Sequence, residues 1–209
     1  MRWLIQILCL SMLVVSFVAA PVDAPAQQGT QPEAFGLLVD DAQVEAWMGR
    51  EAGIQHPVIP DLAQKDAATL RFYFERAYGQ RAEGVIATAE RAREKTLRFL
   101  PAETVEGVTI YLLGDINDYF AALGANGRAP EWSAGLAILR DGVILIRLAP
   151  RAGSRVEAEM TLAHELNHIA LRRFAQDNHF PHWFYEGLAM TATDDWNLAR
   201  AETLSRASM

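Results

Sequence analysis

The sequence predicts an α+β domain in which a small mixed or antiparallel β-sheet packs on one central helix. Three observations support this fold class: an apolar run at residues 108–113, a hairpin pattern at residues 135–148, and a longer helical pattern that follows residue 154. Once the leader and the proline-containing stretch up to residue 35 are set aside, about 175 residues remain, which is enough for one domain with its own core.

The N-terminal part is predicted to lie outside this domain. Arg2, an apolar stretch at residues 3–20 and small residues beyond it are typical of a secretory signal peptide, residues 1–26, cleaved after Ala26. The alternative is an uncleaved membrane anchor formed by residues 3–20. Residues 27–65 are interpreted as a linker and a poorly defined N-terminal segment. We therefore expect a secreted, periplasmic or cell-envelope protein, or a membrane-anchored one.

Two helices are expected at the start of the domain, which we place at residues 66–209. Residues 66–79 carry Leu70, Tyr73, Phe74 and Ala77 at helical spacing, and residues 82–100 also have a helical pattern. These are the additional N-terminal helices of the predicted fold.

The predicted sheet begins with residues 108–113, a β-branched apolar run typical of a buried strand. A helix-like segment at residues 115–123 follows. Residues 135–140 and 143–148 are two further apolar runs joined by Asp141-Gly142, a dipeptide suited to a two-residue type I′ turn. The sequence thus predicts a β-hairpin there.

The central helix is expected to begin at a capping box formed by Ser154 and Glu157. It contains His164 and His168, which differ by about 40° around a helix, so that both rings can reach one metal ion. Glu165 lies about 100° away on the same helix. This is the position of a general base that takes a proton from a water on the metal, and not that of a ligand.

A catalytic zinc takes three protein ligands, and Glu186 is the candidate for the third. It lies in a segment that Pro181 opens as a short second helix, 18 residues after His168. The HExxH motif followed by Pro-x-Trp-x-x-Glu-Gly-x-Ala resembles the gluzincin metallopeptidases of the peptidase MA-like family. The resemblance implies a zincin-like fold with a short C-terminal helical part, one zinc on His164, His168 and Glu186, and Glu165 as the base. Without a metal, Glu186 would be a surface carboxylate on an amphipathic helix.

Two features bear on substrate handling. Many gluzincins stabilise the reacting carbonyl with a downstream Tyr or His, whereas residues 187–209 contain neither, so the candidates lie upstream: Tyr185 and His182, with His179 and Tyr119 behind them. A histidine at the start of a helix is more often a packing or capping residue, and this is the favoured interpretation of His182. In relatives an edge strand before the zinc helix pairs with extended substrate, and residues 143–148 look similar in position, although an interior strand has the same apolar pattern. No other substrate-binding residue is predicted.

The predicted function is that of an exported zinc metallopeptidase, which hydrolyses peptide bonds of a peptide or protein substrate with a zinc-activated water and Glu165 as general base. The alternative is a catalytically weak or inactive zinc-binding protein that acts as a binding or regulatory module in the cell envelope. A third hypothesis is a structural helix pair with no metal. The formal charge of −7 and the lack of a basic stripe argue against nucleic acid as a partner. Membrane contact is expected only through an uncleaved leader, and the pattern predicts no oligomeric state.

Overall fold

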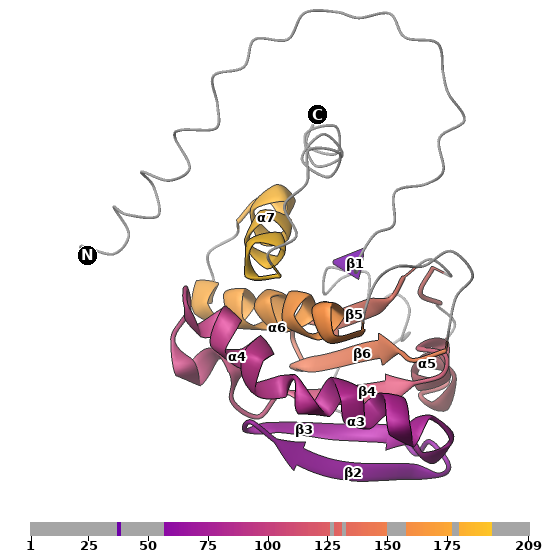
Figure 1. Cartoon of the computed structure of the whole chain (residues 1–209). Helices are drawn as coiled ribbons and strands as arrows, with labels where there is room; N and C mark the ends of the chain where they lie inside the picture. The colour runs from indigo at the N-terminus through magenta and orange to yellow at the C-terminus, as the bar shows by residue number, and fades with distance from the viewer. Residues whose placement is uncertain are drawn as a thin grey trace, which may run out of the picture. The chain divides into compact units, whose positions relative to one another are not determined.

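The computed structural model describes residues 37–38, 57–125, 128–130, 133–149, 158–176 and 180–193. The expected leader, most of the expected linker and the capping residues Ser154 and Glu157 lie outside these ranges. Within them the chain has an α+β fold, with a mixed sheet packed against helices (Figure 1). The elements are β1 (Leu37–Leu38), β2 (Leu62–Ala67), β3 (Leu70–Glu75), α3 (Gly79–Ala87), α4 (Ala89–Leu97), β4 (Thr109–Leu113), α5 (Asn117–Ala122), β5 (Gly135–Ile138), β6 (Val143–Arg147), α6 (Ala158–Ala175) and α7 (His182–Ala192), with short 3₁₀ turns at Arg76–Tyr78 and Ala102–Val105.

The sheet has the strand order β1-β5-β6-β4-β3-β2. Strands β3, β4 and β6 run parallel to one another, while β2 and β5 run antiparallel to their neighbours β3 and β6. The two-residue strand β1 pairs in parallel with the outer side of β5. All five residues of β4 are buried, as expected of a central parallel strand that is covered on both faces.

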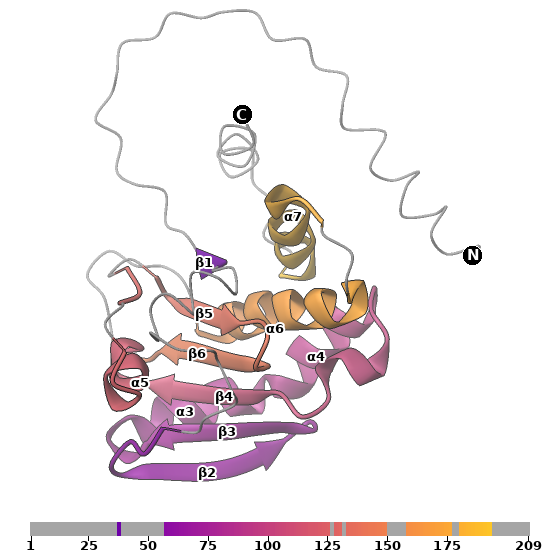
Figure 2. The ribbon, with the colours of Figure 1, turned by 180° about the vertical axis from the view of Figure 1, so that it is seen from behind.

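Helices cover the two faces of the sheet unequally. In Figure 1, α3, α4 and α6 lie in front of the sheet, and in Figure 2 they lie behind it, so the three share one face. The larger core cluster lies on this face, whereas α5 packs on the other face with a smaller cluster around Tyr111, Tyr119 and Phe120. Helix α6 is buried continuously from Thr161 to Leu171, which confirms the expectation of a central helix.

The expected helix at residues 66–79 is wrong, because most of this stretch forms the β2–β3 hairpin. Leu70, Phe72 and Phe74 face the core with the period of two that a strand requires, and β2 already begins at Leu62. Ala68 and Thr69 connect the strands with φ values of 52° and 67°. Two left-handed central residues are the geometry of a type I′ turn, which normally uses Asn and Gly.

The second hairpin is confirmed, with two corrections. Ile138 pairs with Val143, so the loop between the strands has four residues. Gly142 has a positive φ of 63°, but the φ of Asp141 is not positive. A two-residue type I′ turn is therefore absent here. The expected edge strand at residues 143–148 is also wrong, because β6 lies between β5 and β4 and has no open side.

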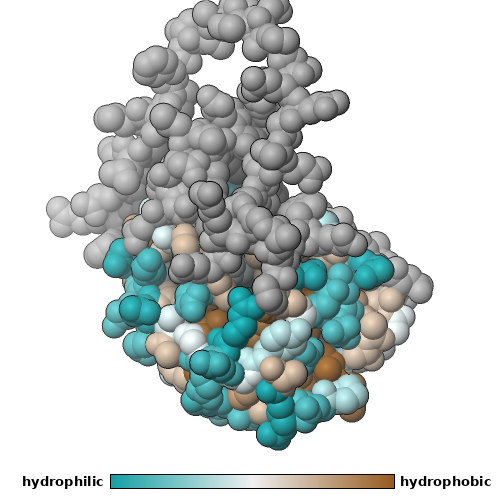
Figure 3. All heavy atoms as spheres, turned by 45° about the vertical axis from the view of Figure 1, so that its right-hand side comes forward, coloured by the Kyte–Doolittle hydropathy of each residue, from teal (hydrophilic) through white to brown (hydrophobic). Residues whose placement is uncertain are grey.

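The expected helix at residues 82–100 forms as two helices, α3 and α4, which meet at Thr88. Helix α4 packs along α6, and Asn167 Nδ2 donates a hydrogen bond of 3.3 Å to Thr96 Oγ1 across this contact. Hydrophilic residues are scattered among small apolar areas on the described face seen in Figure 3. Among the described residues, no helix is long and apolar enough to cross a membrane.

Candidate metal centre

Two histidines on α6 converge on one point. His164 and His168 are one helical turn apart and both are buried, with 2% and 0% of their surface exposed. Their Nε2 atoms lie 3.0 Å apart, and their rings meet edge to face. The arrangement follows directly from the spacing of four residues on a helix, which brings both side chains to the same side.

The third donor comes from α7, which packs against α6. Pro181 precedes this helix in an extended conformation, and Glu186 lies one turn into it. Its Oε2 lies 3.5 Å from Nε2 of His164, and its Oε1 lies 3.5 Å from Nε2 of His168. Glu186 is thus brought to the histidines by tertiary packing, and its side chain is largely shielded at 14% exposure.

This group fits a zinc ion. Ligand bonds of about 2.0–2.1 Å at tetrahedral angles place donor atoms roughly 3.3 Å from one another. The observed separations of 3.0, 3.5 and 3.5 Å bracket that value. Among the residues that the structure describes, these three form the one group of at least three His, Cys, Asp or Glu side chains close enough to share an ion. Three protein donors leave a fourth position for water or substrate, as in catalytic zinc sites.

Glu165 is separate from the donor group and fully buried. Its carboxylate lies against β5, since a Cβ atom added to Gly135 would be 3.2 Å from Glu165 Oε1. Desolvation raises the pKa of Glu165 well above 4.5, and the charge of Glu186 raises it further. The backbone N–H of Ala137 acts to lower this pKa, although its geometry falls short of a hydrogen bond to either carboxylate oxygen. A nearby cation would favour the ionised carboxylate that a base requires.

The structure adds one residue that the sequence did not suggest. Gly135 has no side chain, and this lets α6 approach β5: a Cβ atom there would lie less than 3.0 Å from Thr161 Cγ2. Glycine carries no reactive group, so no chemical motif pointed to it. The signal that could have found it is a glycine at the start of an otherwise apolar strand run, where the close approach of another element is a common reason for glycine.

The other predicted site residues have different surroundings. Tyr185 is buried in the larger core cluster, with its ring 6.3 Å from that of Phe180. Tyr119 lies in the cluster on the opposite face of the sheet and is not part of the metal group. His182 is the first residue of α7, but its side chain is outside the described set, as is all of His179.

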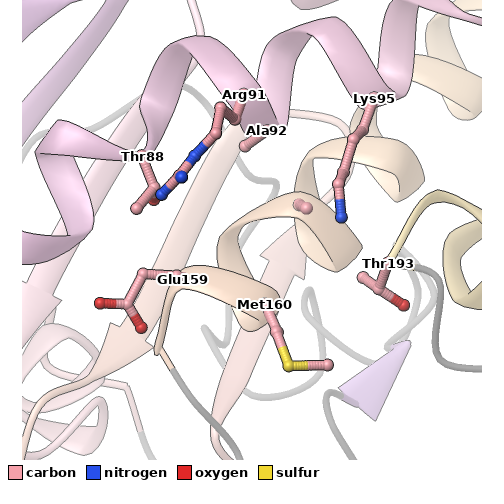
Figure 4. Close-up of a pocket in the computed structure, with 8 residues that line it drawn as sticks. Thr88, Arg91, Ala92, Lys95, Glu159, Met160 and Thr193 are labelled. Carbon is pink, nitrogen blue, oxygen red and sulfur yellow. The ribbon is translucent and has the colours of Figure 1, made fainter.

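A cavity of about 220 Å³ lies between α4 and α6, separate from the metal group. In Figure 4, Lys95 and Thr193 approach each other on one side, while Arg91, Thr88 and Glu159 lie on the other. None of the three metal donors lines it. It therefore adds nothing to the metal site itself.

Comparisons with protein-family models, with curated proteins and with solved structures gave no match for this chain.

Proposed function

We propose that this chain is a zinc metallopeptidase of the gluzincin, peptidase MA-like type, with a zincin-like fold and one zinc ion on His164, His168 and Glu186. The observation that supports this most strongly is the convergence of three donor atoms from two helices, with Glu165 buried one residue away from the first donor. Chance would not be expected to combine the HExxH spacing, the glutamate from α7 and a shielded carboxylate in one place.

The residues divide the chemistry between them. When bound, zinc supplies a Lewis acid that lowers the pKa of water from 15.7 towards about 7. His164, His168 and Glu186 would hold and orient the ion. Because these three side chains are buried or largely shielded, the surrounding residues restrict where the ion can bind. Glu165 accepts the proton of the attacking water and passes it to the leaving amine, because it is close to the donors without being one of them.

The test combines metal analysis with cleavage of a peptide library by purified residues 27–209. We expect about one zinc per chain, cleavage that a chelator abolishes, and a Glu165→Gln variant that keeps zinc but cleaves about 10²–10⁴-fold more slowly. Glu159→Gln is the matched control, because Glu159 lies on the same helix but lines the separate cavity. Full activity in Glu165→Gln would refute the role of this residue.

A second candidate is a zinc-binding protein of the same fold without turnover, acting as a binding or regulatory module. The lack of Tyr or His in residues 187–209 favours it. Stoichiometric zinc with no cleavage of any library member would select this candidate. Absence of zinc would instead leave a structural helix pair, in which the histidines share a hydrogen bond of 3.0 Å.

Two further parts of the proposal concern the donor to the reacting carbonyl and the leader. Tyr185 and His182 remain the two candidates for the donor that stabilises the reacting carbonyl. If one of them has this role, replacing it by phenylalanine should lower kcat and leave zinc binding unchanged, whereas the same replacement of the other should leave kcat unchanged. We also propose export through residues 1–26. Mass analysis of the protein from the cell envelope or medium distinguishes cleavage after Ala26 from retention of residues 3–20 as an anchor.

A further inference from the structure

The outer side of β5 is a place where a second polypeptide backbone can add. In the part of the chain that the structure describes, β5 has β6 on one side and the two-residue β1 on the other. A sheet edge presents main-chain N–H and C=O groups that pair readily with an extended chain. Here one short segment of the same chain covers that edge.

The register shows which groups of β5 face outward. The N–H of Arg147 donates to the carbonyl of Ala134, which makes these two a hydrogen-bonded pair. Antiparallel pairs alternate, so Leu136 bonds inward to β6, while the main-chain groups of Gly135 and Ala137 point away from it. β1 pairs with this outward side, where its residues align with Leu136 and Ala137.

The same outward edge borders the proposed base. Gly135 is in close contact with Glu165, since a Cβ atom built on it would be 3.2 Å from both Cγ and Oε1 of that side chain. A peptide that pairs with Gly135 and Ala137 would therefore pass beside Glu165. β1 now lies in this position, close to where α6 begins in both ribbon views (Figures 1 and 2).

We propose that β1 occupies the place of an extended peptide substrate, so that the segment around Leu37–Leu38 is a built-in competitor that substrate must displace from β5. The inference rests on the proposed function. A tethered segment competes at an effective concentration in the millimolar range. Among the described residues this pairing covers two positions, and a peptide that pairs along the whole of β5 would make more main-chain bonds and could replace it. The apparent affinity for substrate is then the intrinsic affinity multiplied by the fraction of molecules in which β5 is open.

The test weakens β1 in the full chain after the leader. Leu37 aligns with Leu136, so its N–H faces the outward groups of Gly135 and Ala137. The double substitution Leu37→Pro and Leu38→Pro removes this donor, because proline cannot donate to a strand ladder. We expect KM for an extended peptide to fall by about tenfold, with kcat and zinc content unchanged. Gln27→Pro with Gln28→Pro, placed in the expected linker, is the matched control and should leave KM as it is.

A second arm adds the segment back. A synthetic peptide of residues 33–42 should inhibit the proline variant competitively and the wild type about tenfold less. An unchanged KM in the variant together with no inhibition by this peptide would overturn the proposal.

A third measurement does not depend on turnover. In the Glu165→Gln background, the proline substitutions should speed hydrogen exchange at Ala137 and tighten binding of a fluorescent extended peptide. Equal exchange and equal binding in both chains would refute the role of β1. If neither chain cleaves any peptide while these two differences appear, the proposed activity fails and the competition at β5 stands.

Discussion

The close contact between α6 and β5 makes a sharp prediction for Gly135→Ala. The added methyl group would lie less than 3.0 Å from Thr161 Cγ2 and 3.2 Å from Cγ and Oε1 of Glu165. Thr161 is fully buried on the central helix, so it has no open space into which to move. Overpacking of this kind costs about 1–3 kcal/mol, a large part of the 5–15 kcal/mol that a typical domain has. The substitution should also displace the Glu165 carboxylate and lower kcat.

Urea denaturation of the zinc-free proteins measures the stability effect, and three matched variants give it meaning. Gly84→Ala, in the exposed interior of α3 with no contact closer than 3.7 Å, should stabilise the chain by about 1 kcal/mol. Thr161→Ser removes the clashing methyl but keeps the hydroxyl, so the double variant Gly135→Ala with Thr161→Ser should recover at least half of the loss. A Gly135→Ala chain as stable as wild type, or a loss that Thr161→Ser does not relieve, would refute the close packing of α6 on β5.

Three other predictions follow from features described above. In zinc-free protein, Glu165→Gln should be more stable than wild type at pH 8 by about 1 kcal/mol or more, because a carboxyl group whose pKa is raised in the folded state destabilises the fold once it ionises. This gain should vanish as the pH falls to about 4, where the carboxyl group is protonated in both the folded and the unfolded state. A series of urea midpoints measured at different pH values checks this. Thr96→Val should cost about 1–3 kcal/mol in the same assay because it leaves Asn167 on α6 without its partner, and an unchanged midpoint would contradict this. Replacing Ala68-Thr69 by Asn-Gly should raise thermal stability by about 1–2 kcal/mol, since both positions have positive φ, and a loss of stability would exclude the type I′ geometry.

The metal group could be predicted from sequence because most of it is local. Two histidines four residues apart need only a helix to meet, and that helix formed where its apolar pattern placed it. Glu186 needed more, since its approach depends on how α7 packs on α6. Hydrophobic periodicity does not show that Glu186 approaches the histidines; the resemblance of its segment to the second gluzincin motif does.

The errors lie where local pattern is ambiguous. Leu70, Tyr73 and Phe74 fit a helical face, but Leu70, Phe72 and Phe74 fit a strand equally well, and Tyr73 instead stacks on Tyr111 at 5.1 Å on the other face. The turn that decides between them carries no Gly or Asn. The edge strand was misplaced for a different reason: strand order is a property of tertiary pairing, and runs as apolar as 135–140 and 143–148 do not reveal which is outside.

The division of the donors between α6 and α7 has a consequence for the C-terminal part of the chain. A metal ion held by His168 and Glu186 would be a cross-link that closes a loop of 18 residues, in the manner of a disulfide. Loop closure of this length is worth about 3 kcal/mol. Metal supply would then decide whether α7 stays docked, and limited proteolysis after chelation should cut the segment between the two helices first.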